Sequence, residues 1–374
     1  MKMRLIMLTA VLTPLLMCNT LCAQDERPCI QVALLLDTSN SMDGLIEQAR
    51  TRLWDVVNQF ARMSKNGVKP ALAVALYEYG NDNLPSAQGY IRLVCPFTDN
   101  LDRVSEQLFA LNTNGGSEYC GQVIKRAVEE LAWSRSARDL KVIFIAGNEP
   151  FSQGDVDYRE ACRRAIAKGI IVNTIFCGPR EEGIRTGWKD GADLADGKYA
   201  FIDQNQAVEH IEAPQDAELG RLSDSLNRTY IAFGDGGPTG QARQAEQDKN
   251  ASMASPAVAA QRALSKASAF YSNSEWDLVD AVRESKVKIE SLKPSDLPKE
   301  MRTMDAKQRE EYILAKAQER KRIQAMITAL AEERSRFIAQ ERQRRAQKDV
   351  GATLDEAMIK AVKDQAAARG FQMD

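Results

Sequence analysis

The segment Asp37-Thr38-Ser39-Asn40-Ser41 has a carboxylate and two serine hydroxyls at alternate positions, and this spacing is suited to holding a metal ion. This D-x-S-x-S segment follows the apolar run 30–36 directly and precedes a long amphipathic stretch at 44–63. One carboxylate and two hydroxyls on a short loop can face a single point, and hard cations such as Mg²⁺ prefer oxygen ligands. A helix cap at Asp37 or Ser39 would explain one of these residues but not their spacing.

The apolar runs around this segment predict a mostly parallel sheet. Strands are expected at 30–36, 71–79, 90–94, 140–146, 169–176 and 198–202, with helices at 44–63, 101–111, 121–133 and 157–168. Strands that alternate with helices are typical of a doubly wound α/β sheet, with the third strand antiparallel at or near an edge. Such sheets bind ligands at the carboxyl ends of their strands, which is where Asp37 is expected.

The arrangement resembles a von Willebrand factor A domain with its metal-ion-dependent adhesion site, over residues 28–211. The matching features are the D-x-S-x-S loop, a second loop at Asn114-Gly115-Gly116-Ser117-Glu118, and a third loop at Ala146-Gly147-Asn148-Glu149-Pro150. The resemblance implies the mostly parallel, Rossmann-like sheet of this family. It also implies a site for Mg²⁺ or Mn²⁺ formed by Asp37, Ser39, Ser41, Ser117 and Asn148.

Two positions depart from the family pattern. Ser117 stands where the family has threonine and keeps the hydroxyl, with Thr113 as a weaker candidate. Asn148 replaces an aspartate that acts through water, so it adds no charge, and such a loss typically lowers metal affinity roughly 10–100-fold. We interpret Glu118 and Glu149 as solvated loop residues, although either could restore negative charge. With fewer carboxylates, the resemblance implies that an acidic residue from a partner completes the metal shell.

The first residues are typical of a targeting segment. Lys2 and Arg4 precede an apolar stretch at 5–17, and Leu21-Cys22-Ala23 offers a small-residue cleavage site. We therefore expect a signal peptide at 1–23 and export to the periplasm, with an envelope lipoprotein or a secreted protein as alternatives. No later segment approaches the length of a transmembrane helix.

The cysteines left after signal removal have no metal-binding CxxC spacing. They are Cys29, Cys95, Cys120, Cys162 and Cys177. An oxidising compartment allows disulfides, and the odd count leaves at least one thiol. A Cys120–Cys177 bridge and a Cys162–Cys177 bridge are both conceivable, and buried, inert thiols are the alternative.

The composition excludes several classes of function. The formal net charge of −2 gives no bulk reason to expect nucleic acid as a partner. The single histidine, His210, has polar neighbours and is interpreted as a surface or packing residue. No nucleophile motif or phosphate loop is present, so we do not expect an enzyme.

The second half of the chain predicts helices. We divide the mature chain into a von Willebrand A domain at 24–212, a linker and loop with a short helix at 213–258, and an all-α region at 259–374. Residues 241–258 are small and polar, which predicts a mobile loop or a poorly packed helix. A long charged helix is expected at 305–348, with an apolar stripe that Arg320 and Arg334 interrupt. It is expected to form a hairpin with a helix at 353–368 or a coiled coil between chains.

These features predict a metal-dependent binding module of the bacterial cell envelope. Its partner would be a protein or an envelope ligand, and the helical arm offers a means of self-association. The alternative is a structural or assembly protein that has a vestigial metal site and acts through its C-terminal helices.

Overall fold

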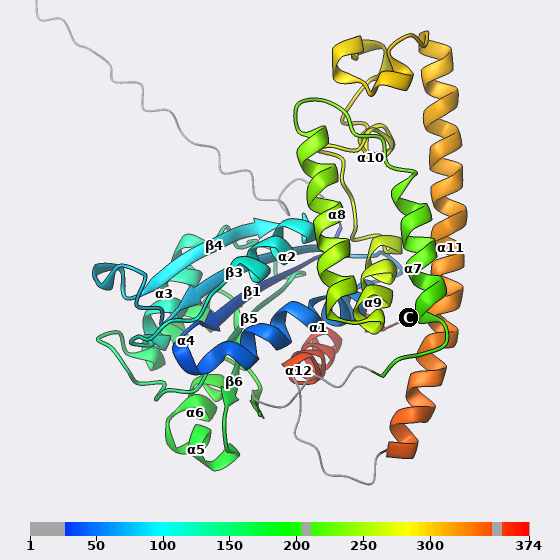
Figure 1. Ribbon diagram of the computed structural model, residues 1–374. Helices are drawn as coiled ribbons and strands as arrows, with labels where there is room; N and C mark the ends of the chain where they lie inside the picture. Colours follow the sequence, from blue (N-terminus) through cyan, green and yellow to red (C-terminus); the bar gives the residue numbers. More distant parts are fainter. Residues whose placement is uncertain (1–26, 204–210, 346–353, 374) are drawn as a thin grey trace, which may run out of the picture.

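A computed structural model describes residues 27–203, 211–345 and 354–373, and its centre is a twisted six-stranded sheet (Figure 1). The strands lie in the order β4-β3-β1-β5-β6-β7. Their bounds are β1 Cys29–Asp37, β3 Ala71–Tyr79, β4 Ile91–Thr98, β5 Leu140–Gly147, β6 Ile171–Cys177 and β7 Tyr199–Ile202. All neighbours are parallel except β3 and β4, and β4 forms an edge. The predicted α/β sheet is therefore confirmed, including its antiparallel edge strand.

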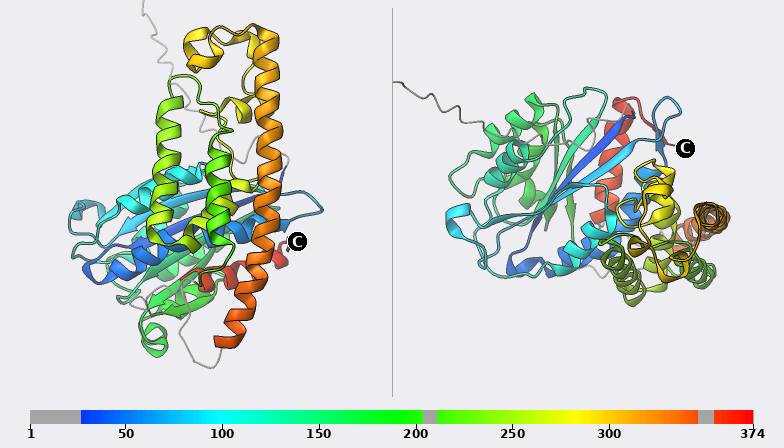
Figure 2. Two further views of the ribbon diagram at one scale, coloured as in Figure 1. Left: turned by 45° about the vertical axis from the view of Figure 1, so that its right-hand side comes forward. Right: turned by 90° about the horizontal axis from the view of Figure 1, so that it is seen from above.

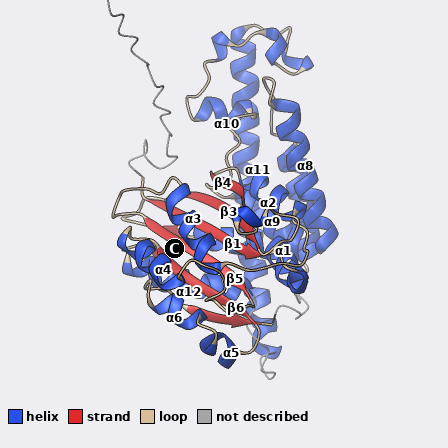
Figure 3. Cartoon of the chain, turned by 90° about the vertical axis from the view of Figure 1, so that its left-hand side faces the viewer, coloured by secondary structure: helices blue, strands red, loops and turns tan. Residues whose placement is uncertain are grey.

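Helices cover both faces of this sheet, as Figure 3 shows in side view. Alternate residues of each strand point to opposite faces, and both faces are apolar because both are covered. On one face, Val32 and Val74 belong to the core beneath α1 (Asp43–Ala61), α2 (Leu101–Ala110) and α12 (Leu354–Ala368). On the other, Ala33 and Ala75 belong to the core beneath α3 (Cys120–Glu130), α4 (Tyr158–Ala167) and α6 (Trp188–Asp193). The short α5 (Arg180–Arg185) precedes α6.

The remaining helices form a second layer beside the sheet, which we call the helical region (Figure 2). It consists of α7 Asp216–Asn227, α8 Gly237–Ala254, α9 Pro256–Ala267, α10 Leu278–Arg283 and α11 Ala306–Arg345. Its apolar core includes Leu219 and Leu226 of α7, Ala263 of α9, and Ile323 and Ile327 of α11. α11 has 40 residues and is about 60 Å long at 1.5 Å per residue. No helix among the described residues is long and apolar enough to cross a membrane.

The segment 213–258 contains the expected short helix, α7, but the rest of it differs from the expected linker and loop. It forms α7 and the 18-residue helix α8, and both pack against α9. α8 is rich in small and polar residues, yet one of its faces is packed. Gln244 is buried and hydrogen-bonded to Tyr271, and Gln247 is buried and hydrogen-bonded to Ser105. A face that packs through amides has no apolar periodicity, so the sequence pattern left a mobile loop and a poorly packed helix as alternatives and did not reveal this packing.

The last helix also differs from expectation. α12 packs on α1 and contacts β5, β6 and β7, whereas α11 packs on α7, α9 and α10. The expected α11–α12 hairpin is therefore wrong, and α12 belongs to the α/β layer and not to an all-α region at 259–374. Met358 and Val362 are buried on the sheet side of α12, and Gln365 exchanges hydrogen bonds with Asn173 of β6 at 2.6 and 3.1 Å.

The arginines that interrupt the stripe of α11 are buried ion-pair partners. Arg320 Nη1 lies 2.7 Å from Asp277 Oδ2 and 3.0 Å from Asp280 Oδ1. Arg334 Nε lies 2.5 Å from Oδ1 of Asp216 on α7. The apolar stripe and both arginines therefore face the rest of the same chain.

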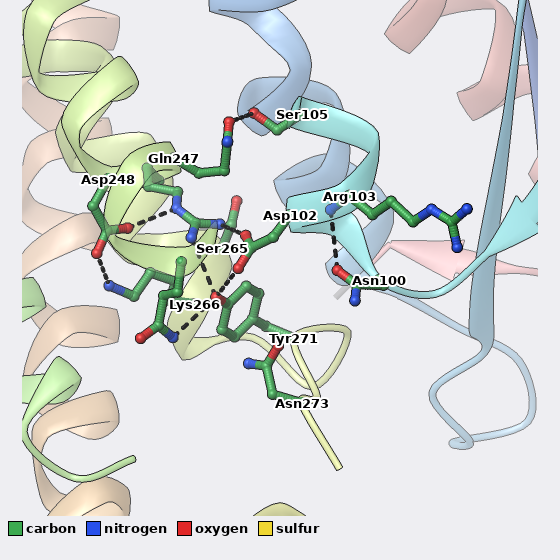
Figure 4. A network of polar contacts seen from close by, with 12 residues as sticks. Asn100, Asp102, Arg103, Ser105, Gln247, Asp248, Ser265, Lys266, Tyr271 and Asn273 are labelled. Atoms are coloured by element: carbon green, nitrogen blue, oxygen red, sulfur yellow. Dashed lines mark hydrogen bonds and ion pairs between the residues drawn. The ribbon is translucent and has the colours of Figure 1, made fainter. Parts of the chain in front are cut away.

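A polar network joins the helical region to the sheet layer (Figure 4). Arg262 of α9 bridges Asp102 of α2 and Asp248 of α8, with ion-pair distances of 2.5 and 2.9 Å. Tyr271 donates a hydrogen bond to Asp102 Oδ2 at 2.6 Å, and Lys266 donates one to Asp248 Oδ2 at 2.7 Å. Arg262 and Lys266 are almost fully buried, and burial of charges at this depth requires such pairing.

The cysteines form neither disulfide considered above. Cys95, Cys120, Cys162 and Cys177 are free, buried thiols, so both bridges to Cys177 are wrong. Burial raises the pKa of these thiols, which favours inert packing groups. The proposed signal peptide at 1–23, its Cys18 and Cys22, and His210 lie outside the described residues.

Candidate metal site

The candidate metal site lies where neighbouring strands end at the same edge of the sheet. Asp37 is the last residue of β1 and pairs in register with Tyr79, the last residue of β3. On the other side of β1, Leu36 pairs with Ala146, so Gly147 of β5 lies beside Asp37. Because the sheet extends from β1 toward β3 on one side and β5 on the other, Asp37 lies at a switch point, where open α/β sheets bind ligands.

The D-x-S-x-S loop brings its carboxylate and hydroxyls together. The backbone N–H of Ser39 donates to Asp37 Oδ1 at 2.8 Å, and the hydroxyl oxygens of Ser39 and Ser41 are 3.5 Å apart. Asp37 and Ser39 are buried, whereas Ser41 is exposed. The turn Asn40–Met42 and the following α1 both begin without a side-chain cap, so the helix-cap explanation for Asp37 and Ser39 is wrong.

The third loop places Asn148 against the first loop. Asn148 Nδ2 donates a hydrogen bond to Ser41 Oγ at 3.1 Å. Its Oδ1 is buried without a hydrogen-bond partner. The side chain therefore reaches the D-x-S-x-S loop, with an acceptor oxygen left over.

The second loop contributes a residue that the sequence interpretation treated as solvated. Glu118 is only 4% exposed and its side chain hydrogen-bonds to those of Asp37 and Ser39. Ser117, the expected ligand, is half-buried. The Thr113 hydroxyl bonds to Asp43 at the start of α1. Glu118 is thus the second-loop side chain that meets Asp37, and sequence alone offered only its position beside Ser117 as a signal.

Burial raises the pKa of both carboxyl groups in this pair. For Asp37, burial is the largest cause of the increase. The pKa of Glu118 is raised further, by burial first and then by the charge of Asp37 and the hydrogen bond between them. Both acids therefore resist ionisation, and because they lie in contact, they titrate as one pair.

Two glycines leave room for these carboxyl groups. A Cβ atom on Gly80 would come within 2.7 Å of Glu118 Cγ and 2.8 Å of Asp37 Oδ1. A Cβ atom on Gly147 would come within 3.0 Å of Asp37 Oδ2 and 2.5 Å of the Tyr79 hydroxyl. Contacts this short require a neighbour to move, so glycine at both positions keeps the space around Asp37 open.

The donor set fits a hard divalent cation. Buried oxygens without a hydrogen-bond partner include Asp37 Oδ2, Glu118 Oε2 and Asn148 Oδ1. Unsatisfied buried oxygens are unfavourable, and a cation with its waters would satisfy them. Within the described ranges, no three His, Cys, Asp or Glu side chains gather to hold a metal ion. A cation here would therefore depend on the hydroxyls of Ser39 and Ser41 as well.

Trp188, beside the third loop, is a packing residue. It is fully buried, and its ring contacts those of Phe151 and Phe176 with centroids 4.7 and 5.8 Å away. Its indole N–H donates to the Glu149 carbonyl at 2.8 Å. This contact fixes the backbone next to Asn148.

Comparison with known proteins identifies the class of this domain. Residues 31–192 match the family model of the von Willebrand factor type A domain. Together with the sheet order and the D-x-S-x-S loop at the end of β1, this match shows that these residues form a von Willebrand factor type A domain. No curated protein matches the chain.

Solved structures resemble this chain at low identity. One is proximal thread matrix protein 1 from the mussel byssus with a zinc-occupied MIDAS motif, at 12% identity and a TM-score of 0.37, covering 48% of this chain and 43% of that one. A second is BatB from Bacteroides thetaiotaomicron, at 17% identity and a TM-score of 0.35, covering 46% and 90%. A third is the SpRpn10 VWA domain, at 13% identity and a TM-score of 0.37, covering 48% and 91%. The chain thus spans less than half of the mussel protein.

Proposed function

We propose that the domain binds a protein or another envelope ligand through a divalent cation, and that it does so without catalysis. Asp37, Ser39 and Ser41 would hold the cation, and Asn148 would accept a hydrogen bond from one of its waters. The cation would supply an electrophilic point to which a partner's oxygen can bind. The observation that carries this proposal is the convergence of the Asp37 carboxylate with the Ser39 and Ser41 hydroxyls beside unpartnered buried oxygens.

The position of the helical region supports a binding role for the exposed loops. α1 begins next to the site at Asp43, and Asn58 near its other end hydrogen-bonds to Gln261 of α9 at 2.9 and 3.0 Å. The two positions are about 22 Å apart along the helix at 1.5 Å per residue. The helical region thus packs against the opposite end of α1, and Ser41 is exposed to a partner.

Titration calorimetry of Mg²⁺ and Mn²⁺ into the purified protein tests this proposal. Saturable binding is expected in the wild type and should be lost in Asp37→Ala, which removes the central carboxylate. Circular dichroism and a thermal melt would show that the variant remains folded. Absence of binding at millimolar metal in folded wild-type protein would refute cation-dependent binding by the free protein. Turnover of ester, peptide or glycan substrates would refute the non-catalytic role.

The alternative of an assembly protein that acts through the C-terminal helices has less support. The apolar stripe of α11 packs within the chain, through Ile323 and Ile327, and its buried arginines pair with α7 and the α10 segment. A coiled coil between chains would need this stripe. Size-exclusion chromatography with light scattering distinguishes the proposals, since assembly through α11 requires a stable oligomer in the absence of metal.

We also propose export to the periplasm, on the basis of the basic start, apolar stretch and small-residue site in residues 1–23. Fractionation of cells that produce the protein, with N-terminal sequencing of the mature chain, tests this location. A chain that starts at Gln24 is expected, and an intact Met1 terminus in the cytoplasm would refute export.

A further inference from the structure

We propose that Glu118 is a second carboxylate ligand of the cation, so that the chain itself neutralises the charge of a divalent ion. This inference rests on the proposed function, because it requires a cation at Asp37, Ser39 and Ser41. Nothing in the family match assigns a role to Glu118.

The geometry of the second loop directs Glu118 into the site. Gly116 adopts φ +131°, and a Cβ atom there would lie 2.3 Å from the Gly80 carbonyl oxygen, so this loop packs closely on the end of β3. The backbone N–H of Glu118 then donates to Gln153 Oε1 at 2.5 Å. Both contacts fix the residue where its side chain reaches Asp37 and Ser39.

The Glu118 carboxyl has the properties of a ligand that lacks its cation. Its side chain is buried, and Oε2 has no hydrogen-bond partner, as is also true of Asp37 Oδ2. Within the described part of the chain, no lysine or arginine forms an ion pair with either carboxyl group. Two buried carboxyl groups in contact are unfavourable when both ionise, and a divalent cation between them balances both charges. Asn148 contributes no charge, so Asp37 and Glu118 are the two buried carboxyl groups that would face the ion.

The ligand set then consists of carboxylate and hydroxyl oxygens with an amide oxygen nearby. Oxygen-only sites select hard cations such as Mg²⁺ and Mn²⁺. With two carboxylates, the site should bind the ion in the free protein, before any partner contributes an oxygen. On this assignment the chain supplies both charges itself, so an acidic residue from a partner would not be needed to hold the ion.

Four variants of the full chain test this assignment by Mn²⁺ calorimetry. Glu118→Gln keeps the size of the side chain and removes its charge, while Glu149→Gln does the same at a half-buried carboxylate beside the site. Ser117→Ala tests the residue that the family resemblance assigns, and Asp37→Ala reports on the site as a whole. We expect Glu118→Gln to weaken binding at least tenfold, and Glu149→Gln and Ser117→Ala to weaken it less than threefold.

The results separate this inference from the proposed function. If Asp37→Ala abolishes binding but Glu118→Gln weakens it less than tenfold, or no more than Glu149→Gln does, the ligand role of Glu118 is overturned and the proposed function stands. If the wild type binds no Mn²⁺, both are overturned. Thermal melts without metal provide the folding control: Glu118→Gln should melt at or above the wild-type temperature, because a neutral amide replaces a buried acid. Added Mn²⁺ should then raise its melting temperature less than that of the wild type.

Discussion

Arg262 Nη1 lies 2.5 Å from Oδ1 of Asp102, and this buried ion pair links α9 of the helical region to α2 of the von Willebrand domain. The guanidinium also stacks between the rings of Trp54 and Tyr271, at 4.5 and 5.0 Å from their centroids. The planar guanidinium of an arginine can form an ion pair and stack on aromatic rings at the same time, whereas the ammonium group of a lysine cannot stack in this way. The two layers are therefore joined by a specific contact in addition to apolar packing.

Arg262→Met is expected to destabilise the protein by about 3–5 kcal/mol, because Asp102 would remain buried without its cation. The measurement is the free energy of unfolding from urea denaturation followed by circular dichroism. Arg243→Met is the matched control: it breaks the more exposed pair with Glu106, which also joins the helical region to α2, and should cost about 1 kcal/mol or less. Equal losses in the two variants would contradict the role of the buried pair.

Arg320→Met should also destabilise the protein by about 3–5 kcal/mol, since Asp277 and Asp280 would lose their shared cation. Thermal unfolding monitored by the helical signal would show the loss. Arg322→Met, two residues further along α11, changes an exposed side chain and should stay within about 0.5 kcal/mol of the wild type. A tolerated Arg320→Met would show that the apolar stripe alone holds α11.

Met358→Ala tests the docking of α12 on the sheet. Met358 is buried and lines a small apolar cavity with Leu53 and Val57 of α1, so its truncation should cost about 2–5 kcal/mol. The exposed Lys360→Ala on the same helix is the control and should change stability by about 0.5 kcal/mol or less. Urea unfolding of both variants gives the comparison, and a neutral Met358→Ala would mean that α12 is only loosely attached.

Asp55 on α1 makes stability depend on pH. Its pKa is raised to about 6, by burial first and then by the charge of Asp355. An acid whose pKa is higher in the folded state binds its proton more tightly there, so its contribution is fully present below about pH 4 and is lost as pH rises to about 6. The expected loss is about 3 kcal/mol at about 1.4 kcal/mol per pKa unit.

Asp55→Asn should remove this loss, which is measured as the difference in unfolding free energy between pH 4 and pH 7. Glu47→Gln, at an exposed position on the same helix, should retain the wild-type difference. The same pH dependence in Asp55→Asn and wild type would contradict the assignment.

The parts of the fold that follow apolar periodicity could be predicted from sequence. The run IQVALLL lies on β1, and the expected strand at 71–79 matches β3 residue for residue, because a strand covered on both faces must be apolar throughout. Arg320 was interpreted as an interruption because its partners, Asp277 and Asp280, are distant in sequence. A charge that is buried against a partner and a charge that faces water look alike in a helical pattern.

The candidate site could be predicted from local spacing on the first loop and, for Asn148, from the family resemblance. Asp37, Ser39 and Ser41 have a fixed local spacing, and their meeting follows from it. Whether Ser117 or Glu118 faces Asp37 depends on the backbone of Gly116 and on its contact with Gly80. The contact joins two loops that are far apart in the sequence, and their separation does not determine how they are oriented. Only the structure shows this contact.

α12 follows the helical region in the chain and packs on α1 of the sheet layer. The helical region is therefore connected to the sheet layer at two places along the chain, after β7 and before α12. It is an insertion and not a terminal extension, because the chain returns to the sheet layer after it. A fragment that ends at residue 212 would lack α12 and would uncover the parts of α1, β5, β6 and β7 on which this helix packs. The α/β layer of this protein is thus discontinuous in sequence, because its last helix, α12, follows the helical region in the chain.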